Sequence, residues 1–134
     1  MEPLWTEAVL LISAGEADHK FLLSVTGIGN MLHCHSIAEA QHWLGAFPIV
    51  LCDESLPDGD WKTVLSMLRA CQRLVVMSRV ADEVLWSEVL NRGGYDLLPK
   101  PLAIGEARWV LQSALNTLVA PGATGATANE WRCT

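Results

Sequence analysis

The sequence predicts a doubly wound α/β domain built on a five-stranded parallel sheet. Segments typical of strands and helices alternate five times along the chain, which indicates a parallel sheet covered by helices on both faces. Hydrophobic residues make up 51% of the 134 residues, enough to bury both faces of such a sheet. Three of the expected strands end at a polar residue, namely Asp53, Ser78 and Lys100. The carboxyl edge of the sheet is therefore the expected place for chemistry.

Short apolar runs bounded by turn-forming residues predict the strands, and apolar residues at helical spacing predict the helices. Ser36 followed by Glu39 forms a capping box for the second helix, and Gly93 and Gly94 supply the left-handed end of the fourth. The expected strands are 8–13, 31–35, 48–53, 73–78 and 95–99. The expected helices are 16–25, 36–47, 61–68, 81–92 and 104–118.

Composition and charge exclude several classes of protein. A net charge of −6 argues against a general nucleic-acid surface and against binding to anionic membranes. No apolar stretch is long enough to span a membrane, and the first five residues carry a glutamate, Glu2, where a signal peptide is basic. We therefore expect a cytoplasmic protein that contacts neither nucleic acid nor membrane directly.

The domain organisation follows from the same patterns. Residues 7–119 are expected to form one domain, whereas residues 120–134 are rich in Ala, Gly and Thr and lack periodicity. We expect this last segment to be a flexible tail, or a linker to a C-terminal effector domain outside this sequence. The four cysteines, Cys34, Cys52, Cys71 and Cys133, form no CxxC pair and are expected to be reduced thiols, with Cys34 and Cys52 packed as small hydrophobes.

A pair of histidines raises the question of a metal site. His33 and His35 share one face of the expected strand 31–35, as two metal ligands would. A zinc site needs at least a third protein ligand, and the sequence does not place one beside them. We therefore favour the interpretation without a metal.

Three motifs at strand ends resemble those of a known family. They are residues 51–60 (LCDESLPDGD), 77–78 (MS) and 93–101 (GGYDLLPKP). Together and in this order they are similar to the receiver domain of two-component response regulators, over about residues 7–119. The resemblance implies a CheY-like, flavodoxin-like sheet with strand order 2-1-3-4-5 and helices on both faces.

The resemblance also implies roles for individual residues. Asp53 would accept a phosphoryl group from a histidine kinase or a phosphotransfer protein, so the domain would signal rather than act as an enzyme. Lys100 would pair with the phosphoryl oxygens, and Ser78 would donate a hydrogen bond to one of them. Pro101 would form the cis peptide bond that aims Lys100. Asp53 and the carbonyl of Ser55 would be ligands of Mg²⁺.

One departure from the family pattern puts the metal in doubt. Ser13 and Ala14 stand where receivers carry two acidic residues, and Mg²⁺ prefers carboxylate ligands. Without that pair, Lys100 could form a direct ion pair with Asp53 that mimics or blocks phosphorylation. Glu16 or Glu54 could compensate, although Glu16 falls where the first helix begins.

The sequence also indicates a partner surface. Trp86 and Trp109 fall off the main apolar stripes of their helices, and tryptophan is enriched at protein interfaces. Leu97 occupies the position of the family's aromatic switch residue. The resemblance implies that this face, formed by the fourth helix, fifth strand and fifth helix, contacts an effector or a second copy in a homodimer.

Two hypotheses for the function remain open at this point. In the first, the domain is a phosphorelay receiver that accepts phosphate on Asp53 and presents an altered partner face. In the second, it is a degenerate receiver that acts as a phosphorylation-independent interaction module. Asp53, Ser78 and Lys100 favour the first hypothesis, whereas Ser13 and Ala14 favour the second.

Overall fold

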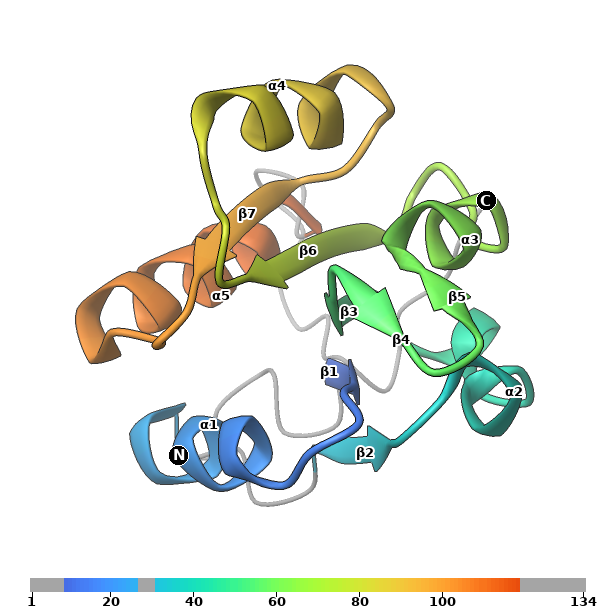
Figure 1. Ribbon diagram of the computed structural model, residues 1–134, viewed down its shortest axis with the longest axis horizontal. Helices are drawn as coiled ribbons and strands as arrows, with labels where there is room; N and C mark the ends of the chain where they lie inside the picture. The colour runs from blue at the N-terminus through green and yellow to red at the C-terminus, as the bar shows by residue number, and fades with distance from the viewer. Residues whose placement is uncertain (1–8, 27–30, 119–134) are drawn as a thin grey trace.

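The computed structural model describes residues 9–26 and 31–118, which form a five-stranded parallel sheet flanked by helices (Figure 1). The strand order β2-β1-β3-β6-β7 confirms the predicted order 2-1-3-4-5. The expected tail 120–134 lies outside the described residues. The strands of the sheet are β1 (Val9–Ile12), β2 (Leu32–Cys34), β3 (Ile49–Asp53), β6 (Arg73–Ser78) and β7 (Asp96–Pro99).

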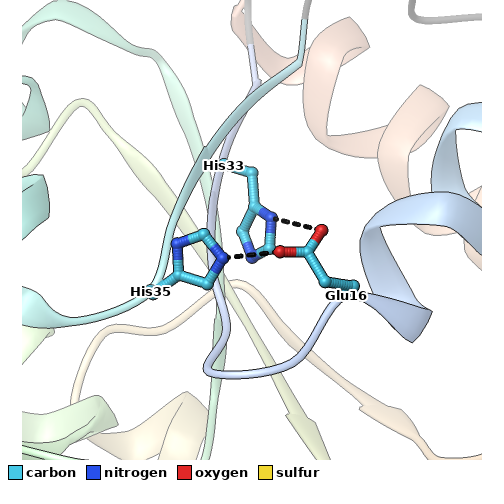
Figure 2. Close-up of side chains that lie close together, drawn as sticks. All are labelled: Glu16, His33 and His35. Carbon is cyan, nitrogen blue, oxygen red and sulfur yellow. Dashed lines mark hydrogen bonds and ion pairs between the residues drawn. The ribbon is translucent and has the colours of Figure 1, made fainter.

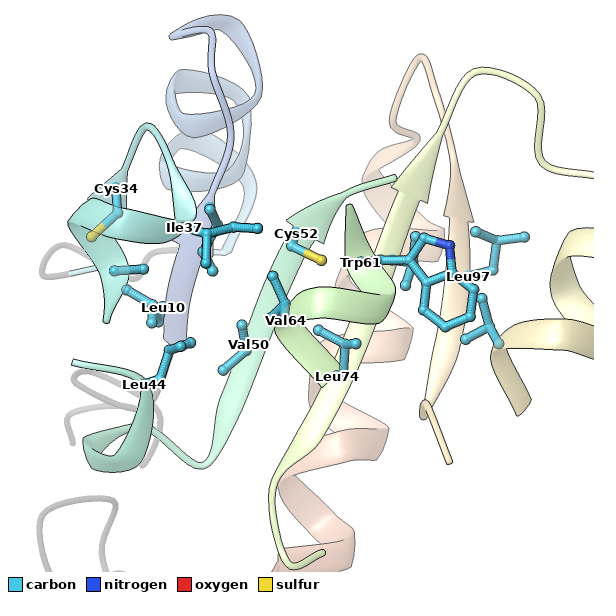
Figure 3. Packing of buried hydrophobic residues seen from close by; sticks show 14 of the residues in the cluster. Leu10, Cys34, Ile37, Leu44, Val50, Cys52, Trp61, Val64, Leu74 and Leu97 are labelled. Carbon is cyan, nitrogen blue, oxygen red and sulfur yellow. The ribbon is translucent and has the colours of Figure 1, made fainter. Parts of the chain in front are cut away.

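The helices divide between the two faces of the sheet. Strand residues alternate between the faces, so that Leu51 packs with the α1 and α5 residues while Val50 and Cys52 pack with those of α2, α3 and α4. Figure 3 shows the second of these clusters, in which the Trp61 ring is almost fully buried. The helices are α1 (Ala17–Thr26), α2 (Ile37–Ala40), α3 (Trp61–Ser66), α4 (Glu83–Asn91) and α5 (Ile104–Leu118).

Local sequence explains where several helices begin and end. The Ser36 side chain accepts a hydrogen bond from the Glu39 amide at 3.1 Å, which confirms the predicted cap of α2. Asp60 and Asp82 cap α3 and α4 in the same way, so each helix starts with a satisfied amide donor. Gly93 follows α4 with a φ of +102°, the left-handed end that the glycine pair predicts.

The second helix is shorter than the spacing predicts. It ends at Ala40, and a 3₁₀ turn, η1 (Leu44–Ala46), replaces its last part. Pro48 disfavours helical geometry at Phe47, which is extended at φ −119° and ψ 127°. The Gln72 side-chain amide donates to the carbonyls of Leu44 (2.5 Å) and Phe47 (2.7 Å). These two carbonyls therefore have hydrogen-bond donors without the backbone amides of a continued helix.

A small hairpin after β3 was not predicted. Its strands β4 (Ser55–Leu56) and β5 (Gly59–Asp60) are antiparallel, and Asp58 in the turn accepts hydrogen bonds from the Ile37 and Ala38 amides at 2.9 Å each. These bonds hold the hairpin against the start of α2. They also lower the pKa of Asp58.

Cys34 and Cys52 agree with the sequence prediction, whereas Cys71 is disulfide-bonded, against the expectation of reduced thiols. Cys34 and Cys52 are free and buried, and burial raises the pKa of the Cys52 thiol. Both therefore serve as packing groups in the cluster of Figure 3. Among the described residues, no helix is both long and apolar enough to cross a membrane.

Candidate functional site

Asp53 ends the central strand β3, and both of its carboxylate oxygens have a donor. Lys100 Nζ lies 2.5 Å from Asp53 Oδ1, and the Ser13 hydroxyl donates to Asp53 Oδ2 at 2.8 Å. Ser13 follows β1 and Lys100 follows β7, so three strands of the sheet contribute to the contact. The direct ion pair expected when Ser13 replaces an acidic residue is therefore present.

Asp18 is a member of this site that the sequence interpretation missed. Its Oδ2 lies 2.6 Å from Lys100 Nζ, so the ammonium sits between the carboxylates of Asp18 and Asp53. Burial alone would lower the pKa of Lys100, but the two carboxylates outweigh it and the pKa is raised. An acidic residue in the first turn of a helix is usually explained by the helix dipole, which is why this one gave no separate signal.

Ser78 lies at the expected edge of the sheet but bonds a different carboxylate. Its buried hydroxyl donates to Glu54 Oε1 at 2.5 Å and accepts a hydrogen bond from the Val80 amide at 3.0 Å. Lys100 is fixed nearby, since its own amide donates to the Ser78 carbonyl at 2.8 Å. The structure thus pairs Asp53 with Lys100 and Ser78 with Glu54.

The structure also describes Pro101 and Ser55, the two remaining residues of the expected site. The peptide bond between Lys100 and Pro101 is cis, as the resemblance implies. Ser55 is exposed at the start of the hairpin strand β4, two residues after Asp53. The proposed carbonyl ligand therefore lies on the chain immediately beyond the phospho-acceptor candidate.

The donor set around Asp53 fits Mg²⁺ poorly. Magnesium is bound in proteins by one or two carboxylates with near-ideal octahedral geometry, and it also keeps several waters. Here the Asp53 oxygens are occupied by an ammonium and a hydroxyl donor, and the end of β1 offers Ser13 and Ala14 rather than carboxylates. The chain's own Lys100 supplies the positive charge beside Asp53.

The expected partner surface is divided between two hollows. Trp86 is 47% exposed on α4, and together with Leu97 and Pro99 it lines a hollow of about 330 Å³. The Trp86 indole donates to Asp96 Oδ1 at 3.3 Å, which ties α4 to β7. Trp109 is 67% exposed on α5 and lines a separate hollow of about 320 Å³. Leu97 itself is buried.

Comparisons with known proteins find similarity in the fold but not in the sequence. No family model matches the chain, and no curated protein matches it. Solved structures match most of it. A BeF₃-activated DrrB receiver domain has a TM-score of 0.73 at 15% identity, with 81% of this chain and 97% of that chain covered.

Two further solved structures give the same result. The receiver domain of a putative LuxO repressor protein from Vibrio parahaemolyticus has a TM-score of 0.74 at 15% identity and covers 82% of this chain and 90% of its own. A CheX–CheY–BeF₃–Mg²⁺ complex from Borrelia burgdorferi gives 0.71 at 22% identity, with 81% and 88% covered. The chain therefore has the CheY-like fold of response regulator receiver domains.

Proposed function

We propose that this domain is a phosphorelay receiver that accepts a phosphoryl group on Asp53. The observation that carries the proposal is the contact of 2.5 Å between Asp53 at the end of the central strand and Lys100 at the end of β7. A mostly buried carboxylate held against an ammonium at this edge is what a phosphoryl acceptor requires, because the cation can then bind the transferred group. The donor would be a histidine kinase or a phosphotransfer protein.

The transfer is a displacement at phosphorus. An Asp53 oxygen forms a bond to phosphorus while the bond from phosphorus to the donor nitrogen breaks, and the nitrogen keeps the electron pair and takes up a proton. We assign the attack to Oδ2, since it gives up only the neutral hydrogen bond from Ser13. Oδ1 stays beside Lys100, whose ammonium then pairs with the phosphoryl oxygens.

Ser78 offers a physical route from the acceptor to the partner face. To donate to a phosphoryl oxygen, its hydroxyl has to leave Glu54. The Val80 amide is bonded to the same hydroxyl oxygen, so that movement would shift the loop that leads into α4. We propose that the shift reaches the hollow lined by Trp86 and Leu97, where an effector or a second copy would bind.

A second candidate function is a phosphorylation-independent interaction module. It is favoured by the two donors on Asp53 and by the lack of a carboxylate at Ser13 and Ala14. In that case the ion pair between Lys100 and Asp53 would hold the domain in one state. The hollow lined by Trp86 and Leu97 would then bind its partner constitutively.

Treatment of the purified protein with phosphoramidate or acetyl phosphate, with and without Mg²⁺, distinguishes the two candidates by intact mass. We expect one added phosphoryl group in the wild type and in Asp18→Asn, which keeps the acceptor, and none in Asp53→Asn. The Trp86 indole N–H resonance should shift on phosphorylation, because its bond to Asp96 reports the position of α4. A folded wild type that gains no mass under any condition would leave the interaction module as the better candidate.

A further inference from the structure

Two histidines and a glutamate converge at the carboxyl ends of β1 and β2, beside the Asp53 site (Figure 2). Glu16 precedes α1, His33 lies in β2, and His35 follows that strand. One nitrogen or oxygen atom from each of the three side chains lies within 4.8 Å of the others. Glu16 thus supplies a third candidate ligand beside the two histidines, which the sequence interpretation did not find.

The contacts of His33 fix which of its nitrogens faces the cluster. Its Nε2 lies 2.8 Å from the Ser13 carbonyl oxygen, which can only accept, so Nε2 carries the proton. The other ring nitrogen, Nδ1, faces Glu16 Oε2, 3.9 Å away. The His33 side chain is 5% exposed, which holds the ring in this orientation. Either a proton or a metal ion between Nδ1 and this carboxylate oxygen would make the contact favourable.

His35 has the same arrangement with a carboxylate behind it. Its Nε2 lies 2.8 Å from Glu16 Oε1, and its Nδ1 lies 3.6 Å from Glu39 Oε1. The His35 amide also donates to Glu39 Oε2 at 3.3 Å, so Glu39 is held against the residue by two contacts. A carboxylate or carbonyl behind the non-ligating nitrogen is the usual support of a metal-bound histidine.

We propose that Glu16, His33 Nδ1 and His35 Nε2 bind a divalent transition metal of the zinc type, with an open fourth position. Two imidazoles and one carboxylate are a zinc donor set, whereas Mg²⁺ and Ca²⁺ favour oxygen ligands alone. Neighbouring ligand atoms around a tetrahedral zinc are about 3.4 Å apart, so the widest pair has to close by roughly 1.4 Å. The Glu16 and His35 side chains are 60% and 45% exposed, so both have room to make that movement.

The neighbourhood favours a metal over a simple surface ion pair. An ion pair needs only Glu16 and His35, yet a nearly buried imidazole also turns its free nitrogen to the same point. The ring of His19 packs 4.6 Å from that of His33, and its buried Nε2 has no hydrogen-bond partner among the described residues. Buried nitrogens of this kind call for an explanation, and a nearby ion is one of the usual ones.

Zinc titration in competition with a chromophoric chelator tests the proposal. We expect the wild type to bind one equivalent, and Glu16→Gln or His35→Gln to lose at least about 100-fold in affinity. Both side chains are largely exposed, so neither variant should fail to fold. Glu39→Gln should lose about 10-fold as a positioning residue. The matched control, His42→Gln, removes an exposed histidine outside the cluster and should bind as the wild type does.

Two further measurements make the outcome decisive. Bound Co²⁺ should give visible absorption without the charge-transfer band of a cobalt–thiolate bond, which would otherwise assign the ion to a cysteine. Asp53→Asn should bind zinc like the wild type, since the proposal does not depend on phosphorylation. Equal affinity in the wild type, Glu16→Gln and His35→Gln would overturn the proposal, as would an equal loss in His42→Gln.

Discussion

Two charged clusters flank Ser13 at the same edge of the sheet, and their carboxylates are balanced in different ways. The Ser13 hydroxyl donates to Asp53, and its carbonyl accepts from His33. Around Asp53 the chain's own Lys100 supplies the cation, whereas around Glu16 the opposing groups are two imidazoles whose ring nitrogens face the carboxylate. The Asp53 carboxylate thus already has a cation from the chain, whereas the Glu16 carboxylate faces groups that can bind a proton or a metal ion.

Removal of the internal cation should have the largest effect. Lys100→Met leaves the carboxylates of Asp18 and Asp53 facing each other without a counter-charge, and the three side chains are only 12–21% exposed. Loss of one partner from a buried ion pair costs about 3–5 kcal/mol, and the partial exposure favours the lower end, about 3 kcal/mol. Urea unfolding at neutral pH measures the change in the free energy of unfolding.

A matched exposed pair provides the control for that measurement. Lys62 lies 3.4 Å from Glu88, with both side chains more than a third exposed. Lys62→Met should therefore cost at most about 1 kcal/mol. If the two lysine variants lose the same stability, the ammonium does not balance the Asp53 cluster in the way the geometry indicates.

A restored carboxylate at the end of β1 should convert the closed cluster into an open one. Ser13→Asp adds a negative charge beside Asp53 and removes a hydroxyl donor, so without metal it should be less stable than the wild type. Mg²⁺ should then stabilise it, by about 1.4 kcal/mol at ten times the dissociation constant. Thermal unfolding with and without Mg²⁺ is the measurement.

The control variant Ser13→Asn has nearly the shape of Ser13→Asp but no charge, so it separates the effect of charge from that of shape. Ser13→Asn adds no carboxylate, so Mg²⁺ should not raise its stability. Mg²⁺ should also leave the stability of the wild type unchanged. A wild type that Mg²⁺ stabilises as much as Ser13→Asp would show that the Asp53 site already holds the metal, against the poor fit of its donors.

The fold could be predicted from the sequence because its signals are local. Apolar runs that end at turn residues mark the strands, and one strand-end residue on each of two strands predicts the contact between Asp53 and Lys100. The break after α2 was missed because it depends on Gln72, a residue 28 positions after Leu44 whose side chain satisfies its carbonyl. Such a contact leaves no periodic pattern in either segment.

The clusters around Asp53 and Glu16 were predicted only in part, because they too depend on contacts between distant parts of the chain. Asp18 and Glu16 lie two residues apart at the start of α1, and side chains at that spacing point in different directions around a helix. Which of them reaches Lys100 and which reaches His33 depends on the path of the chain after β1. The parallel pairing that places Leu11 opposite His33 is likewise a long-range feature. The histidine pair could therefore be found from the sequence, whereas the position of Glu16 beside it could not.

The smallest effect, a pH dependence of stability, should distinguish the open cluster from the closed one. The hydrogen bond to Glu16 raises the pKa of His35 above its ordinary 6.5, and the same bond lowers that of Glu16 below 4.5. A raised histidine pKa stabilises the fold below 6.5, and this contribution is lost as the pH rises through the raised value. A lowered carboxyl pKa stabilises above 4.5, so the pair contributes fully between about pH 4.5 and 6.5.

His35→Gln tests this contribution, and burial, which is the main cause of the lowered pKa of His19 and gives that group the opposite pH dependence, acts in both proteins. With a chelator present, the difference in urea midpoint between the wild type and His35→Gln should be larger near pH 5.5 than near pH 8.5. The raised pKa of Lys100 keeps that group charged across the interval, so its own titration adds no pH dependence to this comparison. Equal differences at both pH values for His35→Gln would mean that its imidazole does not form the ion pair with Glu16 in solution.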